Sequence, residues 1–141
     1  MKMKPRAKPI DWALAQTQKR PGKLGSVSAD IDRVTRLVYG RVLALREGAR
    51  VSGISFHGMM LQYQVTWGQD VDHGIVDGVH RKTAADGYGF YLGKSGKDAR
   101  ILPYPGCATL RGMPEDGWVV KDMDDDEIVD VISRSLMWTA D

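Results

Sequence analysis

The chain has 141 residues, the size of one domain with a sizeable buried core. Its composition, 43% hydrophobic and 27% charged with a net charge of +2, excludes a disordered polyelectrolyte. The apolar stretches are far shorter than the roughly 20 residues of a membrane span, and no apolar segment of a secretory signal follows the basic start. Because Cys107 is the only cysteine, we expect no internal disulfide and a cytoplasmic or particle-associated protein that is not secreted.

Residues 1–27 are predicted to form a basic extended arm that precedes a single domain over residues 28–141. Pro5, Pro9 and Pro21 interrupt any long helix in this arm. Residues 1–23 hold seven basic residues against one acid, a net charge of +6, whereas residues 115–141 have a net charge of −7. This asymmetry predicts contacts at the two ends of the chain. The arm residues expected to bind a polyanion or an acidic protein patch are Lys2, Lys4, Arg6, Lys8, Lys19, Arg20 and Lys23.

The spacing of apolar residues predicts a helix over residues 28–47, with Ser28 as its N-cap and Gly48 at its stop. Away from its apolar stripe lies a basic face that could contact phosphates or a protein partner, although a solvated surface is the plain alternative. The candidate binding residues on this face are Arg36, Tyr39, Arg46 and Arg50. Arg41 falls inside the apolar arc, so we expect it to reach solvent, an acid or a partner chain.

Strands are predicted at 50–56, 59–67, 74–80, 87–93, 99–104 and 118–123. The clearest is "MMLQYQVTW", in which Leu61, Tyr63 and Val65 alternate with polar residues and Met60, as in a strand with one buried face. Asp124 and Glu127 then resemble a capping box that begins a terminal helix. The predicted fold class is α+β: an N-terminal helix, an antiparallel sheet or small barrel-like β core, and a C-terminal helix.

The stretch "GARVSGISF" followed by "YQVTWGQD" resembles the early strands of small SH3-like or Tudor-like barrels. The resemblance covers residues 49–78 only and rests on a short motif. It implies a compact binding module without an active site.

Two groups of residues could carry more specific chemistry. "DGYGFYLG" partly matches the base-stacking strand of RNA-recognition domains, although an aromatic-rich sheet strand with glycines at close-approach points is the favoured interpretation. The second group contains carboxylates and imidazoles that could bind a divalent metal, but its spacing matches no established metal loop. Its members are Asp70, Asp72, His73, Asp77 and His80.

The residues favour a non-enzymatic binding or assembly protein that docks on a larger complex, such as a virion or another particle, through its basic arm. The expected partner is another protein or further copies of the chain, with no membrane and no cofactor. One alternative is direct nucleic-acid binding by the arm and the basic helix face. A second alternative is a metal-dependent enzyme centred on residues 70–80. The acidic start of the terminal helix exceeds what capping needs, so we expect it to repel nucleic acid or to receive a basic segment from a neighbouring chain.

Overall fold

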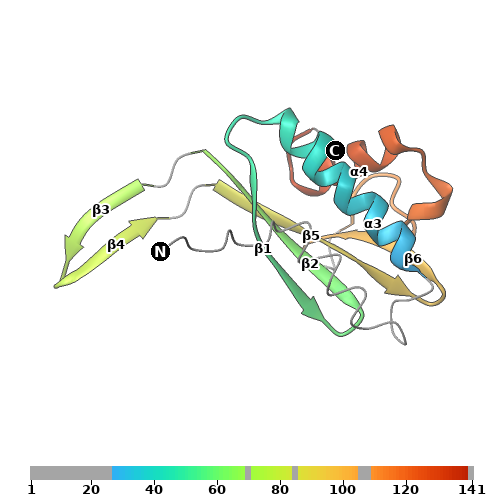
Figure 1. Ribbon diagram of the computed structural model, residues 1–141, viewed down its shortest axis with the longest axis horizontal. Helices are drawn as coiled ribbons and strands as arrows, with labels where there is room; N and C mark the ends of the chain where they lie inside the picture. The colour runs from blue at the N-terminus through green and yellow to red at the C-terminus, as the bar shows by residue number, and fades with distance from the viewer. Residues whose placement is uncertain (1–26, 69–70, 84–85, 105–108, 140–141) are drawn as a thin grey trace, which may run out of the picture.

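The protein is a two-layer α+β domain from which one β-hairpin projects (Figure 1). The computed structural model describes residues 27–68, 71–83, 86–104 and 109–139. The main sheet is antiparallel, with strand order β1-β2-β5-β6-β7. Its strands are β1 (Arg50–His57), β2 (Met60–Trp67), β5 (Asp86–Ser95), β6 (Asp98–Pro103) and β7 (Trp118–Val119). The predicted α+β fold class is therefore confirmed, with a helix before the antiparallel sheet and a helix after it in the chain.

The alternation predicted for residues 59–67 determines which face of the sheet is buried. Leu61, Tyr63 and Val65 of β2 are fully buried and Gln64 is exposed, as predicted. Gln62 departs from the predicted alternation, because it is on the opposite face and is only 8% exposed. Tyr63 stacks on Phe90 of β5, with 4.9 Å between the ring centroids. The same core contains the apolar faces of α3 (Ser28–Leu37) and α4 (Asp125–Ser135), so both helices cover one face of the sheet.

The N-terminal helix is less regular than its sequence predicts. The α-helix ends at Leu37 and continues as a π-helical turn, η2 (Val38–Val42), and a 3-10 turn, η3 (Leu43–Leu45). Ser28 is the first residue of α3 and not its N-cap. The cap position belongs to Val27, which is buried and makes no side-chain capping bond. The helix therefore begins at Ser28 without a side-chain hydrogen bond from its N-cap residue.

The C-terminal helix begins as the sequence predicts. Asp124 is the N-cap of α4, and its Oδ1 accepts a hydrogen bond of 2.8 Å from the backbone N–H of Glu127. The strand predicted over residues 118–123 is shorter in the structure, because β7 ends at Val119 and a 3-10 turn, η4 (Val120–Asp122), follows. This turn places Met123 and Asp125 beside α3.

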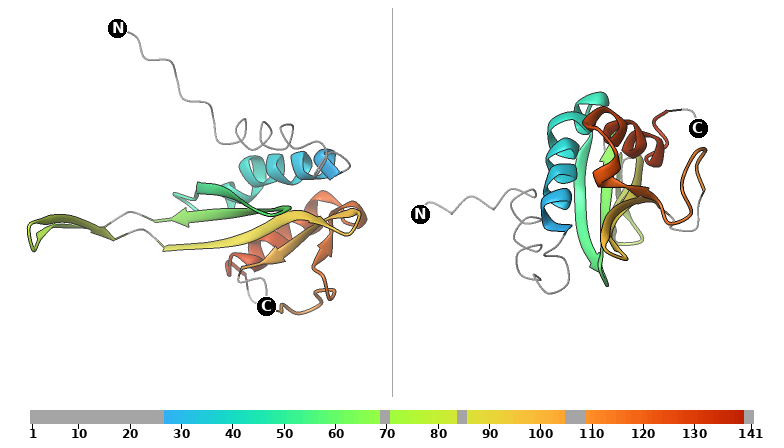
Figure 2. Two further views of the ribbon diagram at one scale, coloured as in Figure 1. Left: turned by 90° about the horizontal axis from the view of Figure 1, so that it is seen from below. Right: turned by 90° about the vertical axis from the view of Figure 1, so that its right-hand side faces the viewer.

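The second sheet is a hairpin of two strands, β3 (Val71–Val76) and β4 (Val79–Thr83). The single strand predicted over residues 74–80 is wrong, because the chain reverses at Asp77 and Gly78 between β3 and β4. Both views show the hairpin extending away from the sheet and helices (Figures 1 and 2). None of the helices in the described part of the chain is long and apolar enough to cross a membrane.

Candidate functional site

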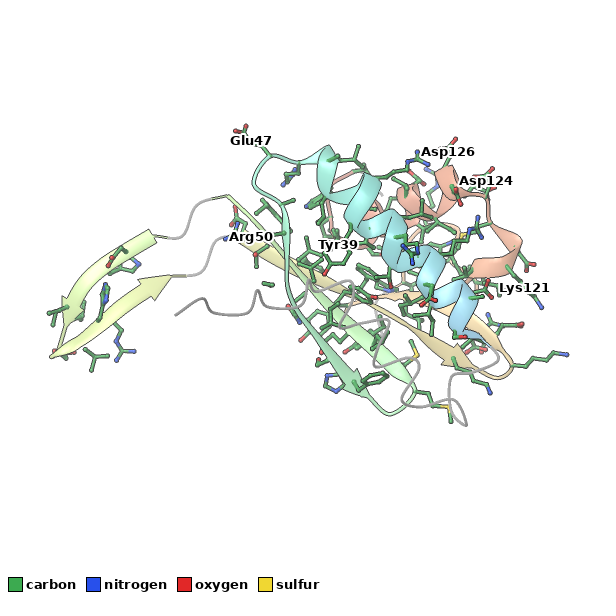
Figure 3. All side chains as sticks on the ribbon, in the orientation of Figure 1. Tyr39, Glu47, Arg50, Lys121, Asp124 and Asp126 are labelled. Carbon is green, nitrogen blue, oxygen red and sulfur yellow. The ribbon has the colours of Figure 1, made fainter. Side chains whose placement is uncertain are left out.

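The candidate binding residues of the N-terminal helix do not form one continuous basic face. Arg36 is exposed on α3, and no described residue pairs with its guanidinium group. Tyr39 lies in the π-helical turn with its hydroxyl oxygen buried, and burial raises its pKa to about 12. Figure 3 shows Tyr39 and Arg50 in separate parts of the fold. The Arg50 guanidinium donates hydrogen bonds to the carbonyl oxygens of Gly48 (2.9 Å) and Gly68 (3.1 Å).

Arg46 lies at the C-terminal end of the helical segment, against two tryptophan rings. Its guanidinium carbon is 5.2 Å from the ring centroid of Trp67 and 5.4 Å from that of Trp138. These distances permit a cation–π contact with each ring. The aromatic contact thus fixes the orientation of Arg46, while its side chain stays exposed to solvent.

An open groove of about 490 Å³ runs along α3 beside the start of α4. It contains Asp32, whose Oδ1 is buried without a hydrogen-bond partner among the described residues. Burial raises the pKa of this carboxyl group, and the charge of Arg36 opposes the shift. The residues that line the groove are Ala29, Asp32, Arg33, Arg36, Leu37 and Asp125.

The acidic start of α4 binds basic side chains of the same chain. The Arg33 guanidinium donates to Asp125 Oδ1 at 2.8 Å and to the Met123 carbonyl oxygen at 2.9 Å. Arg41 forms an ion pair of 2.7 Å with Asp126. Arg41 therefore leaves the apolar arc that a regular helix would give it, because the π-helical turn changes the angular spacing of the residues. Asp125 thus joins α4 to α3, and Asp126 joins α4 to η2.

The aromatic strand "DGYGFYLG" is the centre of the main sheet and not a base-stacking platform. Phe90, the second ring of the RNA-recognition pattern, is fully buried under the helices. Gly89 and Gly93 are close-approach points, since a Cβ atom would lie 2.6 Å from the Tyr63 carbonyl oxygen and 2.2 Å from that of Met59. This arrangement confirms the interpretation of the stretch as a sheet strand.

The predicted metal-binding residues do not converge. His80 and Asp72 form a pair, with 2.7 Å between His80 Nε2 and Asp72 Oδ1. Asp77 occupies the hairpin turn, and Asp70 lies outside the described residues. Among the residues that the structure describes, no three His, Cys, Asp or Glu side chains are placed to hold a metal ion. The Asp72–His80 contact joins the two strands of the hairpin.

Local hydrogen bonds and turn chemistry shape the hairpin. Asp77 and Gly78 both have positive φ (52° and 78°), as a two-residue type I′ turn requires. Asp72 Oδ1 also accepts a hydrogen bond of 2.8 Å from the backbone N–H of Gly74. This bond, followed by the one with His80, lowers the pKa of the Asp72 carboxyl group. The dipeptide Asp77-Gly78 between two valines was the signal that could have revealed the hairpin.

The tip of the hairpin exposes three aliphatic side chains. Ile75, Val76 and Val79 are 77%, 43% and 52% exposed, and every residue from 72 to 81 is exposed. A two-stranded hairpin without a packed apolar face is marginally stable in water. We define Ile75, Val76, Asp77, Gly78 and Val79 as the hairpin tip and take it as the candidate functional site. Sequence reasoning missed it.

Residues 1–26 of the predicted basic arm (1–27) and Cys107 lie outside the described residues, and Val27, the last arm residue, is buried in the core. No family model, curated protein or solved structure matches the chain. The SH3-like resemblance of residues 49–78 stays a prediction. The geometry of the described residues therefore provides the evidence on function.

Proposed function

We propose that this chain is a non-enzymatic binding or assembly protein that contacts a partner protein through its hairpin tip. The observation that carries the proposal is a projecting hairpin whose aliphatic side chains are exposed and lie outside the hydrophobic core. Monomeric proteins rarely expose grouped apolar side chains unless the group serves an interaction. Docking of the tip into an apolar pocket would remove these side chains from water and stabilise the hairpin.

The charge of the hairpin tip favours a protein partner over nucleic acid. The tip contains one aspartate and no lysine or arginine, and the basic residues of the hairpin, Arg81 and Lys82, lie further along β4. Nucleic-acid binding depends on lysine and arginine contacts with phosphates, which the tip does not offer. The basic arm at residues 1–23 would add an electrostatic contact with the same larger complex, which on this proposal is a virion or another particle.

A cross-linking experiment tests the class of partner. A photoreactive amino acid replaces Val76 in the full chain, expressed in the cells from which the protein comes, and replaces Met59 in the matched control. Met59 is also an exposed apolar residue, but it lies at the opposite end of β2, in the β1–β2 turn. We expect an adduct from position 76 that protease degrades and nuclease does not, and no such adduct from position 59.

The result would contradict the proposal if position 76 cross-linked only to nucleic acid, or no more than position 59. Val79→Asp in the position-76 chain supplies a further control, because a charge at the tip opposes burial in an apolar pocket. This change should remove the adduct while the circular dichroism spectrum of the chain stays the same.

Direct nucleic-acid binding remains the second candidate function. The observation that favours it is Arg36, an exposed guanidinium group on α3 that no described residue pairs. Together with the arm, Arg36 could contact phosphates. This candidate predicts nucleic-acid adducts and loss of affinity in Arg36→Glu.

A further inference from the structure

A second candidate surface, which we call the tryptophan corner, lies where β2 and the two helical segments end: Leu45, Arg46, Trp67, Met137 and Trp138. Leu45, Arg46 and Met137 are exposed, whereas the two tryptophan rings are partly buried against the hydrophobic core. The centre of this surface is the Arg46 guanidinium over the two indole rings, which meet edge to face with centroids 5.3 Å apart. Trp67 is the last residue of β2, the strand that leads into the hairpin. The tryptophan corner therefore lies where the helical layer meets the end of β2, the last strand before the hairpin in the chain.

Two exposed apolar residues belong to the same stretches of chain as the arginine and one of the rings. Leu45 precedes Arg46 in the chain and Met137 precedes Trp138, and each is 61% exposed. The described residues contain only two other exposed large apolar side chains outside the hairpin, Met59 and Tyr104. Tryptophan, methionine and arginine are the residues enriched in the centres of protein interfaces. The tryptophan corner therefore has the composition of a binding surface.

The hairpin tip and the tryptophan corner complement each other in chemistry. The tip presents aliphatic side chains around the Asp77 carboxylate, and the corner presents apolar side chains around the Arg46 guanidinium. The salt bridges among the described residues do not include Arg46, and its exposed guanidinium group has the charge needed to pair with Asp77 of another molecule. Glu47 follows Arg46 but points outward from the loop (Figure 3).

We propose that the partner of the hairpin tip is a second copy of this chain, and that the tip docks on the tryptophan corner of that copy. This inference rests on the proposed function and names its partner. The hairpin tip does not cover the tryptophan corner of its own molecule, since the aliphatic side chains of the tip and the apolar side chains Leu45 and Met137 of the corner are exposed in the single chain. The projection of the hairpin lets the tip of one copy reach another without contact between the two sheets (Figure 2).

The contact would be heterologous, because it joins two different surfaces. Each copy would use its tip on one neighbour and its corner on another, so the copies would form a closed ring or an open filament. A set of complementary variants tests this arrangement. The tip variant carries Val76→Asp and Val79→Asp, and the corner variant carries Leu45→Asp and Met137→Asp.

Analytical ultracentrifugation of the purified full chain gives the readout. We expect the natural chain to form species larger than a dimer, and each variant alone to be a monomer whose self-association is weakened more than about 30-fold. An equal mixture of the two variants should form dimers and nothing larger, because the mixture offers one intact tip and one intact corner per pair. Met59→Asp should associate like the natural chain.

A natural chain that stays monomeric at millimolar concentration would overturn the inference. So would variants that associate like the natural chain, or a mixture that forms no dimers. None of these results affects a position-76 cross-link to a different protein, so failure of this inference is distinguishable from failure of the proposed function. Asp77→Asn provides a gentler variant that keeps the turn, since Asn-Gly also forms type I′ turns. It should weaken association about 2- to 5-fold at low salt and leave it unchanged at high salt.

Discussion

Two tyrosines beside the N-terminal helix differ in the contacts of their hydroxyl groups. The Tyr63 hydroxyl forms a hydrogen bond with Thr35 Oγ1 in the core, whereas the buried Tyr39 hydroxyl has no partner among the described residues. A buried polar group without a partner loses its hydrogen bonds to water and gains nothing in return. The two positions therefore form a matched pair for substitution by phenylalanine.

We expect Tyr39→Phe to raise the free energy of unfolding by up to about 1 kcal/mol, because it removes an unsatisfied buried hydroxyl. Tyr63→Phe should lower it by about 1 kcal/mol, because it removes the bond to Thr35. Urea denaturation of the two variants and the natural chain measures both changes. A loss of stability in Tyr39→Phe would contradict the structure and indicate that this hydroxyl is bonded in solution.

At the scale of elements, the two ion pairs that join α4 to α3 and to η2 differ in their surroundings. Arg33 contacts Asp125 and two partly buried carbonyl oxygens, of Val120 and Met123. Arg41 contacts only Asp126, whose side chain is 85% exposed. Solvent screens the second pair far more than the first.

We therefore expect Arg33→Ala to lower the free energy of unfolding by about 1–3 kcal/mol, since it breaks charge-assisted hydrogen bonds to the turn before α4. Arg41→Ala should lower it by less than about 1 kcal/mol. Equilibrium denaturation in urea compares the two, and high salt should reduce the smaller effect further. Equal losses in both variants would show that the bonds from Arg33 to the carbonyl oxygens contribute little.

The hairpin should be separable from the rest of the domain. Its residues 72–81 are exposed and supply no side chain to the hydrophobic core. Replacement of residues 71–83 by a short glycine-serine linker should therefore leave the melting temperature within a few degrees of the natural value. Thermal unfolding followed by circular dichroism provides the measurement. A chain that no longer unfolds cooperatively would show that the hairpin supports the sheet.

Sequence patterns identified most elements where one face is buried and local chemistry agrees with it. The alternation around Tyr63 predicted β2, and Asp124 with Glu127 predicted the start of α4. The hairpin was not predicted, because the alternation in "GIVDGVH" favours a single strand and the turn at Asp77 and Gly78 inside it was not recognised. The π-helical turn had no sequence signal that we could recognise. The pairing of Arg33 with Asp125, which lie 92 residues apart, depends on tertiary packing and was beyond pattern analysis.

On the scale of the whole molecule, positive net charge is concentrated in the arm. Residues 1–23 carry a net charge of +6, so removing them changes the net charge of the chain from +2 to −4. We expect the full chain to bind a heparin column and the chain of residues 24–141 to pass through it, because heparin is a polyanion. Arg36→Glu in the full chain should reduce the salt needed for elution by much less. Equal elution of the full and shortened chains would show that the arm does not provide the polyanion contact.

The link between α3 and α4 also bears on how the chain reaches its native state during synthesis. Arg33 and Arg41 leave the ribosome long before Asp125 and Asp126, and the apolar side of α3 shares its core with α4. The hairpins of the sheet can form early, but α3 can complete its packing only after α4, near the end of the chain, has been synthesised. A nascent chain stalled before residue 124 would therefore leave part of the core open to water and to chaperones.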